Sequence, residues 1–550
     1  MQVESTTTAT PSSPAQSSPE AAADQLKQEV ARRRTFAIIS HPDAGKTTLT
    51  EKLLMYGGAI HLAGAVKARR AQRHVTSDWM ELERKRGISV TSSVMQFEYA
   101  GCKVNLLDTP GHQDFSEDTY RTLVAADSAV MLLDNRKGVE ERTRQLFEVC
   151  KRRRVPIFTF VNKCDRAGES PLKLLSDVES DLGIACYPVT WPIFGENGFI
   201  GVYDRMHGAV ELFERAQDHG ASRARARAIH LKDPELRNLL EATVYDKLVS
   251  EIELLDAASH TFDLDAVLRG DLSPMYFGSA LTNFGVEAFF HDFLEFAPAP
   301  RPRESTAGLI SPTDPSFTGF VFKIQANMDP KHRDRIAFVR ICSGRFDAGM
   351  RVMHVRTASQ IRLSSPQQFL ARDRTAVEEA WPGDVIGIMD RGTLRIGDSL
   401  STAGPLEFSD IPRFPPEHFA RIIPSDPLKR KQLDTGLREL TEEGAAQVFY
   451  AETAAGPTPI VGAIGMLQFD VMQYRLDHEY GAPCRFEPLS YQHPRWVTGP
   501  KAAIELEARK SGHLRLYDTK GNPVLLFDSE RSMRWAEERD SGLKFHEVAP

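Results

Sequence analysis

Cysteine is scarce in this sequence of 550 residues: there are six, and none forms a Cys-x-x-Cys pair. The sequence therefore indicates neither a disulfide framework nor a zinc site, and its thiols suit a reducing compartment. A run of about 18 uncharged apolar residues is also missing, so no transmembrane helix is expected. Positive charge is not in excess, since the formal net charge is −7. This balance argues against a protein that coats nucleic acid. We expect a cytoplasmic protein with no membrane or DNA partner.

The start of the chain lacks the features of a targeting segment. The stretch MQVESTTTATPSSPAQSSPEAAADQ has neither a positively charged start nor an apolar core, which does not fit a secretory signal. Its bias toward Ser, Thr, Pro and Ala cannot bury enough surface to fold, so we expect a disordered leader over residues 1–30. The remaining chain is long enough for roughly three or four domains of about 100–200 residues each.

A phosphate-binding loop is indicated by SHPDAGKTT, which runs from Ser40 to Thr48. The apolar run before it predicts a buried strand, and KTTLTEKLLMYG predicts a helix that ends at two glycines. The usual pattern is G-x-x-x-x-G-K followed by Ser or Thr, and the small Ser40 takes the place of its first glycine. Gly45 would let the backbone approach phosphate, Lys46 would reach the β and γ phosphates, and the Thr47 hydroxyl would ligate Mg²⁺.

A second apolar strand ends in Asp-x-x-Gly, within VNLLDTPGH (Val104–His112). In nucleotide hydrolases with such a phosphate loop, an acidic residue at the end of a neighbouring strand helps to hold Mg²⁺. Asp108 fits this role, directly or through a water molecule. The Gly111 N–H would then meet the γ-phosphate.

Two later motifs predict a guanine base. IFTFVNKCD ends in Asn-Lys-x-Asp, and the Asp165 carboxylate would accept two N–H bonds from the guanine edge, a pair that adenine does not offer. Asn162 would bond both base and loop, and the Lys163 stem would cover the ring face. In MYFGSALTNFGV, Ser279 and Ala280 would present backbone N–H groups to guanine O6. A metabolic kinase or ATPase is disfavoured, because ATP would bind poorly.

The order of strands and helices predicts a multi-domain protein. Strands that alternate with helices indicate an α/β P-loop GTPase domain with a doubly wound sheet, over residues 31–300. An inserted subdomain is expected at about 168–270. Alternating residues and glycine turns from Phe317 onward predict a β-barrel, over residues 301–408.

The last part of the chain predicts an α+β C-terminal domain, over residues 409–550. SDPLKRKQLDTGLRELTEEG (Ser425–Gly444) predicts an amphipathic helix, with Asp426 as its cap and Pro427 in its first turn. Its apolar stripe would lie in the core and consists of Leu428, Leu433, Leu437 and Leu440. From Pro459 to Gly481 the pattern predicts a strand, a turn and a helix.

Two segments resemble the switch regions of translational GTPases: RKRGISV (Arg84–Val90) and DTPGHQDF (Asp108–Phe115). The barrel and the C-terminal pattern resemble domains II and III of elongation factor G. SHPDAGKTT, SDWMELERKRGIS, GFVFKIQANMDPKHRDR and DPLKRKQL together resemble the bacterial peptide chain release factor 3 family, the class II release factors. This resemblance extends from about Arg32 to the C-terminus, and two further domains of elongation factor G are not expected here.

The resemblance also implies roles for individual residues. His112 matches the histidine that orients the attacking water, and Ser89 takes the position of a threonine that supplies a second Mg²⁺ ligand. Pro42 replaces a residue of the apolar gate around that histidine. We therefore expect His112, Lys46 and Gly111 to be catalytic, and Thr47, Ser89 and Asp108 to hold Mg²⁺. The residues expected to bind GTP or GDP are Ser40, His41, Pro42, Asp43, Ala44, Gly45, Lys46, Thr47, Thr48, Asp108, Thr109, Pro110, Gly111, His112, Asn162, Lys163, Cys164, Asp165, Ser279 and Ala280.

The family resemblance implies a ribosome-dependent GTPase of translation termination. Such a protein would promote release of codon-reading (class I) release factors from the ribosome, with ribosomal RNA near its GTPase domain, and we expect a monomer. Basic residues beside the first switch, such as Arg84 and Arg86, would face that RNA. Two alternatives stay open: another translational GTPase, for translocation or ribosome protection, or a nucleotide-gated ribosome-binding scaffold with little hydrolysis.

Overall fold

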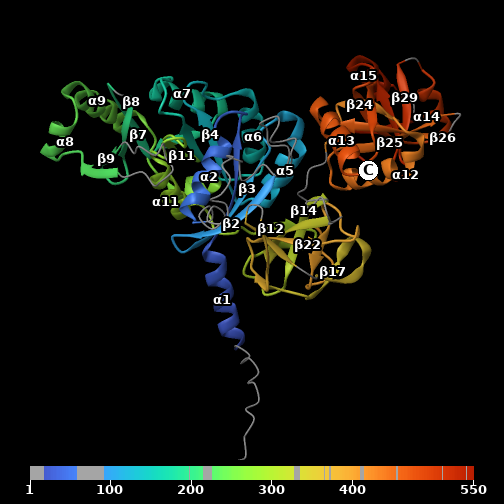
Figure 1. The fold of residues 1–550 in the computed structure, drawn as a ribbon, viewed down its shortest axis with the longest axis horizontal. Helices are drawn as coiled ribbons and strands as arrows, with labels where there is room; N and C mark the ends of the chain where they lie inside the picture. Colours follow the sequence, from blue (N-terminus) through green and yellow to red (C-terminus); the bar gives the residue numbers. More distant parts are fainter. Residues whose placement is uncertain are drawn as a thin grey trace, which may run out of the picture.

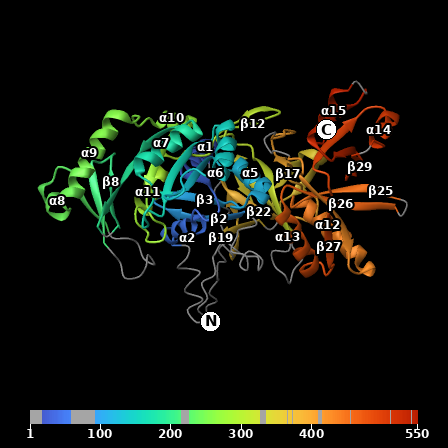
Figure 2. The ribbon, with the colours of Figure 1, turned by 90° about the horizontal axis from the view of Figure 1, so that it is seen from above.

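The computed structural model describes residues 18–58, 92–196, 198–214, 226–326, 335–363, 366–370, 373–408, 414–453, 456–510, 512–539 and 542–549. Three bodies follow one another along the chain: a large α/β body, a barrel-like body and a C-terminal α+β body (Figure 1). Seen from above, an inserted subdomain and the C-terminal body lie at opposite ends of the molecule (Figure 2). Among the described residues, no helix is both long and apolar enough to cross a membrane.

The first body is built on a seven-stranded sheet in the order β2-β3-β1-β4-β5-β11-β6. All neighbouring pairs are parallel except β2 with β3. The strands are β1 (Arg33–Ser40), β2 (Ser93–Tyr99), β3 (Cys102–Asp108), β4 (Ser128–Asp134), β5 (Ile157–Asn162), β6 (Ala185–Pro188) and β11 (Leu272–Phe277). The helices are α2 (Lys46–Tyr56), α5 (Ser116–Ala125), α6 (Glu141–Arg152), α7 (Pro171–Leu182) and α11 (Val286–Phe296), and a 3-10 turn η1 (Gln113–Phe115) precedes α5.

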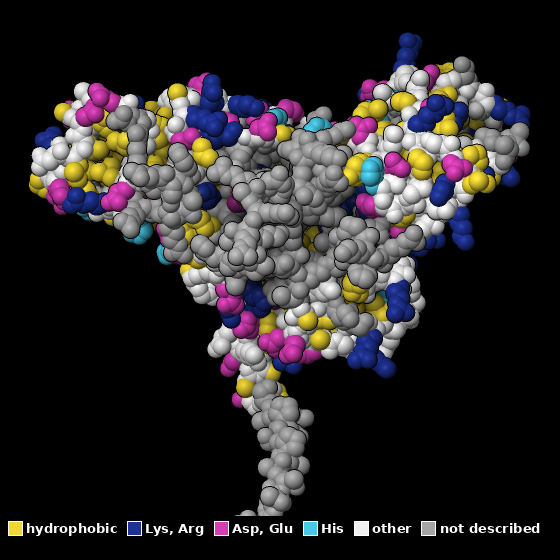
Figure 3. Space-filling view, in the orientation of Figure 1, with side chains coloured by type: hydrophobic (Ala, Val, Ile, Leu, Met, Phe, Trp, Pro, Cys, Tyr) yellow, Lys and Arg dark blue, Asp and Glu magenta, His cyan; other side chains and the backbone are white. Residues whose placement is uncertain are grey.

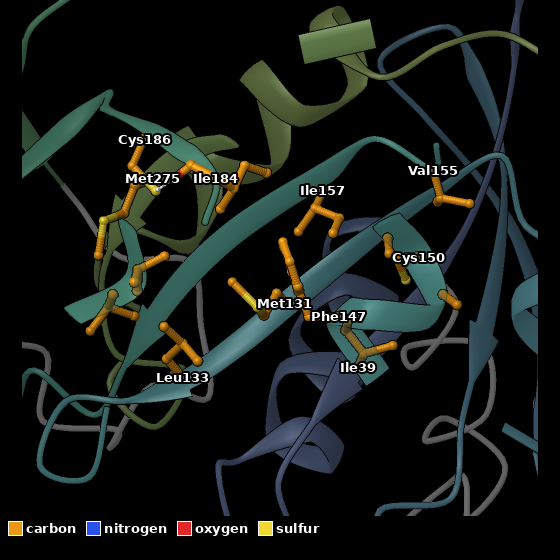
Figure 4. Packing of buried hydrophobic residues seen from close by; sticks show 14 of the residues in the cluster. Ile39, Met131, Leu133, Phe147, Cys150, Val155, Ile157, Ile184, Cys186 and Met275 are labelled. Atoms are coloured by element: carbon orange, nitrogen blue, oxygen red, sulfur yellow. Dashed lines mark hydrogen bonds between the residues drawn. The ribbon is translucent and has the colours of Figure 1, made fainter. Parts of the chain in front are cut away.

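Helices cover both faces of this sheet, because β1 alternates its side chains between two apolar cores. Phe36 and Ile38 share one core with residues of α2 and α11. Ile39 lies in the other core, where Phe147 of α6 packs against Met131 of β4 (Figure 4). A doubly wound sheet, as the sequence predicts, follows from this arrangement.

An inserted subdomain with its own four-stranded sheet, in the order β10-β9-β8-β7, follows β6. Its elements are β7 (Thr190–Gly195), β8 (Gly198–Asp204), β9 (Ala209–Phe213), β10 (Ala226–His230), α8 (Pro234–Leu239), α9 (Ala242–Ala258) and α10 (Leu264–Arg269). Apolar side chains gather over it at the upper left of Figure 3. The insertion expected at about 168–270 also takes in α7 and β6. Since β6 pairs with β11, it extends the main sheet, α7 leads into it, and the separate sheet begins only at β7.

The leader expected to be disordered over residues 1–30 is helical in its second part. Helix α1 spans Pro19–Ala31, with the Ser18 hydroxyl as its cap and Pro19 in its first turn. Leu26 and Val30 lie one turn apart on one face and pack against Trp381 of the barrel-like body. The prediction was therefore wrong for residues 19–30, because the overall composition does not reveal two apolar residues spaced one helical turn apart. Residues 1–17 lie outside the described part of the chain.

The barrel-like body carries an antiparallel eight-stranded sheet in the order β18-β17-β23-β14-β15-β22-β19-β20. Its strands are β14 (Thr318–Ala326), β15 (Arg335–Ser343), β17 (Arg351–His354), β18 (Ser359–Arg362), β19 (Gln367–Leu370), β20 (Asp373–Ala376), β22 (Val385–Met389) and β23 (Ser399–Ser401). Two small pairs accompany it: β12 (Arg303–Ser305) with β13 (Gly308–Ile310), and β16 (Phe346–Asp347) with β21 (Glu379–Ala380). A 3-10 turn, η2 (Val355–Thr357), follows β17.

The turn before β22 joins the barrel-like body to the main sheet. The Gly383 carbonyl accepts a hydrogen bond from Thr35 Oγ1 at 2.7 Å, and Asp384 pairs with Arg33 at 2.9 Å. A second fully buried pair, Arg340 with Asp127 at 2.5 Å, lies in the same interface. Because breaking a buried ion pair is costly, these contacts hold the two bodies in one orientation.

The C-terminal body has an eight-stranded sheet in the order β27-β24-β26-β25-β29-β30-β28-β31. Its strands are β24 (His418–Pro424), β25 (Gln447–Thr453), β26 (Gly456–Ala463), β27 (Cys484–Pro488), β28 (His493–Thr498), β29 (His513–Asp518), β30 (Pro523–Phe527) and β31 (Lys544–His546). Its helical elements are η3 (Pro427–Lys429), α12 (Arg430–Glu442), α13 (Met466–His478), α14 (Lys501–Ala508) and α15 (Glu530–Glu538).

The predicted amphipathic helix over Ser425–Gly444 begins later than expected. Asp426 caps η3 rather than the α-helix, since its carboxylate accepts from the Leu428 N–H at 2.9 Å. Leu433, Leu437 and Leu440 are buried, as predicted. Leu428, which the same stripe included, is 88% exposed. It lies before the first turn of α12 and therefore points away from the helix's apolar face.

Candidate nucleotide site

Four loops meet at one edge of the seven-stranded sheet. Strands β3, β1, β4, β5 and β11 are neighbours and run parallel, so their carboxyl ends lie at the same edge. The loop after β1 carries SHPDAGKTT, and the loop after β3 begins at Asp108, which is level with Ile38. The loops after β5 and β11 carry the two predicted base motifs. The structure thus brings together motifs that lie far apart in the sequence.

The phosphate loop leads directly into the first turn of α2. Gly45 precedes the helix with a φ of 100°, a left-handed conformation that favours glycine. A Cβ atom at Gly45 would lie 2.3 Å from Asn162 Nδ2, so the close approach also requires glycine. The first N–H groups of α2 lack carbonyl partners within the helix and point outward, as an anion-binding loop requires.

Lysine and carboxylate groups lie together beside this loop. Lys46 Nζ donates to Asp108 Oδ1 at 2.5 Å, and both side chains are buried. Thr47 and Thr48 follow in the same turn of α2 and are partly exposed. Thr109 Oγ1 donates to the Ile38 carbonyl at 2.7 Å, which fastens the loop after β3 to β1. The Ser40 hydroxyl is buried and has no hydrogen-bond partner among the described residues.

Asn162 connects the phosphate loop to the loop after β11. Its Nδ2 donates to the Ala44 carbonyl at 2.8 Å, and its Oδ1 accepts from the Ala280 N–H at 2.8 Å. The residue is 2% exposed. A buried amide that uses both of its ends in this way fixes the two loops relative to each other.

Lys163 lies across the same edge. Its Nζ donates to the Asp43 carbonyl at 2.5 Å and to Asp134 Oδ2 at 2.8 Å. Partial burial alone would raise the pKa of the Asp134 carboxyl, but the Lys163 ammonium holds that pKa below its ordinary value. Lys163 and Asp43 both have positive φ angles, of 66° and 67°. Such conformations are uncommon outside glycine and often occur at functional loops.

The predicted base-reading residues are neighbours. Asp165 Oδ1 accepts a hydrogen bond from Ser279 Oγ at 2.6 Å. Asp165 Oδ2 lies 3.7 Å from Arg166 Nε. Cys164 points inward instead: complete burial raises the pKa of its thiol well above the ordinary value. Its N–H donates to the Gly278 carbonyl, so Cys164 joins β5 to the loop after β11 through its backbone.

His112 lies in the loop after β3, next to the phosphate loop. Its Nδ1 is 3.3 Å from the Asp114 N–H donor and 3.2 Å from Asp114 Oδ1. Pro110 accepts from Thr119 Oγ1 at 3.2 Å through its carbonyl. A Cβ atom on Gly111 would lie 3.7 Å from Pro42 Cα, so the two loops pass close to each other.

The sequence reasoning missed three carboxylates at this edge. Asp134 pairs with Lys163, Glu140 lies 3.3 Å from His41 Nε2, and Asp114 contacts His112. Asp134 ends β4, so the strand-end rule that found Asp108 applies to it as well. The contacts of Glu140 and Asp114 depend on tertiary structure. Ser89, Arg84 and Arg86, expected beside the first switch, lie outside the described residues.

Comparison with known proteins now decides among the GTPase families. Residues 31–299 match the family model for the elongation factor Tu GTP-binding domain, and residues 316–403 match that for elongation factor G domain 2. Residues 408–537 match the model for the C-terminal domain of class II release factor RF3. A curated relative named peptide chain release factor 3, from Symbiobacterium thermophilum, is 56% identical over 96% of this chain and 99% of its own length.

The chain belongs to the peptide chain release factor 3 family.

Other members of the release factor 3 family are similarly close. The protein of that name from Gloeothece citriformis is 53% identical, over 96% of this chain and 97% of its own. A crystal structure of a protein from Thermus thermophilus has the same overall fold, with a TM-score of 0.67 at 24% identity, over 90% of this chain and 72% of that one. The prediction of a translational GTPase of this family is confirmed, and the protein is a GTPase with a release-factor role.

Proposed function

We propose that this protein is a ribosome-dependent GTPase of translation termination that promotes dissociation and recycling of class I release factors after peptide release. It stimulates termination without itself recognising a stop codon. The observation that carries the proposal is the match of residues 408–537 to the RF3 C-terminal domain, on a chain whose four nucleotide motifs meet at one sheet edge. That match favours a termination factor over a translocation or ribosome-protection factor.

In the proposed complex, guanine lies between the loops after β5 and β11. Asp165 accepts from the two N–H groups of the guanine edge, and O6 faces the backbone of Ala280, whose N–H donates to Asn162 Oδ1 in this structure. The Lys163 stem covers one ring face. Asn162 holds the loop after β11 against the phosphate loop, so the residues that bind the base and those that bind phosphate keep a fixed relative position. The remaining predicted contacts come from the backbone and side chains of residues 40–48, 108–112 and 162–165.

The phosphates lie over the first turn of α2, where Lys46 and the backbone N–H groups neutralise their charge. A magnesium ion fits this end of the site, since the Thr47 hydroxyl and the Asp108 carboxylate are both oxygen ligands next to the buried Lys46. Ser89 is the proposed third protein ligand. The ion, when bound, stabilises negative charge on the phosphate oxygens.

Hydrolysis requires a water molecule placed in line with the γ-phosphate. We assign this positioning to His112, with Lys46 and the Gly111 N–H stabilising charge on the transferred group. His112 is partly exposed, and its Nδ1 is engaged by Asp114, so Nε2 is the nitrogen left for the water. Ribosomal RNA near the GTPase domain would complete this arrangement, which accounts for hydrolysis that depends on the ribosome.

Several broader features belong to the same proposal. The domain limits are 31–300 for the GTPase domain, 301–408 for the barrel and 409–550 for the C-terminal domain. The protein acts as a monomer in the cytoplasm, with the ribosome and its bound class I release factor as partners and with no DNA or membrane partner. Basic residues beside the first switch would contact RNA backbone.

The proposal is tested by GTP hydrolysis with and without ribosomes. We expect ribosomes to stimulate hydrolysis, ATP to be a poor substrate, and His112→Ala to lower the stimulated rate by roughly 100-fold or more, because the group that positions the attacking water is lost. His291→Ala is the matched control, since that side chain lies on α11 and is 65% exposed. Equal rates for both variants, or no stimulation of the unchanged protein, would contradict the proposal.

A further inference from the structure

Asp114 uses its two carboxylate oxygens on two different bodies of the protein. Its Oδ1 lies 3.2 Å from His112 Nδ1, in the loop after β3. Its Oδ2 accepts a hydrogen bond from the Leu467 N–H at 2.7 Å, in the C-terminal body. The residue is only 8% exposed. One buried side chain therefore contacts both the histidine assigned to catalysis and the first turn of α13.

The contact with α13 is closely fitted. Leu467 is the second residue of the helix, so its N–H has no carbonyl partner within the helix and suits a carboxylate. A Cβ atom on Gly465 would lie 2.1 Å from Asp114 Cγ, so the approach depends on glycine there. Gln468 supports the turn, because its Oε1 accepts from the N–H groups of Ile464 and Gly465 at 2.7 and 3.2 Å.

Helix α13 is firmly built into the C-terminal body. Arg475, 4% exposed, pairs with Glu443 at 2.6 Å and with Glu479 at 2.8 Å. Phe469, Met472 and Leu476 lie in the core that this helix shares with α12. A displacement of the C-terminal body must therefore carry the Leu467 N–H with it.

A small cavity lies beside this contact. Its volume is about 60 Å³, and it lies where the three bodies meet, lined by residues that include Phe115, Lys323, Gly444 and Gln468. Across it, the GTPase body touches the C-terminal body through the hydrogen bond from Arg121 to the Gly444 carbonyl at 3.2 Å. The fully buried ion pairs described above belong to the barrel interface instead.

We propose that Asp114 is a positioning residue that couples the docking of the C-terminal body to the orientation of His112. This inference rests on the proposed function, in which His112 places the attacking water. With Leu467 docked, Asp114 is held on both sides and fixes the imidazole. When the C-terminal body leaves this docked position, the hydrogen bond to Leu467 breaks and the imidazole loses its second support. The docked position is therefore the one that supports hydrolysis on the ribosome. The hydrolysis rate thereby depends on whether the C-terminal body is docked on the GTPase body.

The sharpest test removes a single N–H group. Leu467→Pro deletes the donor within the first helical turn, where proline is tolerated. Met466→Pro places the same residue one position earlier, at the preferred first helical position, and keeps the Leu467 N–H. Met466 is 49% exposed, and the preceding Gly465 has an extended backbone that accepts a following proline. The two variants differ in the hydrogen bond to Asp114 and in the residue before proline, which is the helical Met466 in Leu467→Pro, so Gly465→Ala serves as a second variant without that difference.

We expect Leu467→Pro to lower the hydrolysis rate on saturating ribosomes about tenfold or more, because misplacing a catalytic group is costly. The KM for ribosomes and the affinity for GTP should stay unchanged, and Met466→Pro should resemble the unchanged protein. Gly465→Ala, which pushes on Asp114 without backbone strain, should act like Leu467→Pro. Similar rates for the two proline variants would overturn the inference, as would effects of Asp114→Ala and Leu467→Pro that simply add.

A second readout separates this inference from the proposed function. The imidazole resonances of His112, assigned by comparison with His112→Ala, can be followed by NMR in the full chain labelled at histidine, with no ribosome present. Leu467→Pro should shift them and Met466→Pro should not. Unshifted resonances in Leu467→Pro would refute the coupling even if ribosomes stimulate hydrolysis. Shifted resonances without ribosome-stimulated hydrolysis would uphold the coupling and refute the proposed function.

Discussion

Asn162 joins two loops, one 118 residues before it in the sequence and the other 118 residues after it. Its amide donates to Ala44 in the phosphate loop and accepts from Ala280 in the base loop, both at 2.8 Å. Gly45 must lack a side chain for this approach. At the scale of single residues, the nucleotide site is thus held by one buried amide and the glycine beside it, and Asp165 and Lys163 are positioned around them.

Replacement of Asn162 by alanine should weaken both loops. The Ala44 carbonyl and the Ala280 N–H would lose a buried partner, at a cost of roughly 1–3 kcal/mol for each unsatisfied group. We expect GTP binding to weaken and thermal unfolding to occur at a lower temperature. Asn162→Asp places a buried carboxylate oxygen against the Ala44 carbonyl, so it should be impaired at least as much as Asn162→Ala. Titration of a fluorescent GTP analogue would show this, and an affinity of Asn162→Ala equal to that of the unchanged protein would argue against the bridge.

Helix α1 shows how a single element can be misjudged from composition. It lies beside a stretch rich in Ser, Thr and Pro, but Leu26 and Val30 form an apolar pair one turn apart against Trp381. Arg33, just after the helix, donates to the Glu29 carbonyl at 2.6 Å and pairs with Asp384. The helix is thus fastened where the GTPase body and the barrel-like body meet.

This fastening predicts an effect of Leu26→Ala on local stability. Deleting a buried leucine side chain typically costs about 2–5 kcal/mol, and a cluster of only three buried residues should lie at the lower end. Hydrogen exchange of the α1 amides should accelerate, while hydrolysis in the GTPase body should change little. Gln25→Ala is the control, because that side chain is exposed on the same helix. Unchanged protection in Leu26→Ala would show that Trp381 does not hold α1.

The nucleotide elements were predictable because each motif follows an apolar strand. Parallel strands place their carboxyl ends at one edge, so Ser40, Asp108, Asn162 and Ser279 could be brought together from the sequence alone. Contacts between bodies could not be predicted in this way. The hydrogen bond from Leu467 to Asp114 depends on how the C-terminal body docks, and no periodicity in either segment encodes it. The edge strand β6 was missed because its short run adjoins the inserted subdomain.

At the scale of the whole molecule, the two interfaces of the GTPase body differ in kind. Toward the barrel-like body, fully buried ion pairs and the Gly383 turn form a continuous contact. Toward the C-terminal body, polar contacts at Leu467 and Gly444 surround a cavity. We therefore expect the GTPase and barrel-like bodies to move together, and the C-terminal body to be the part that can change its position relative to them.

The most direct test of the account follows a class I release factor on the ribosome. Ribosomes carrying a stop codon in the decoding site would bind a fluorescent class I factor, and after peptide release this protein would be added with GTP. The account predicts faster dissociation of the label, and loss of that acceleration with Asp165→Asn, whose side chain no longer accepts both guanine N–H bonds. Unaccelerated dissociation, with ribosome-stimulated GTP hydrolysis intact, would contradict a role in recycling release factors.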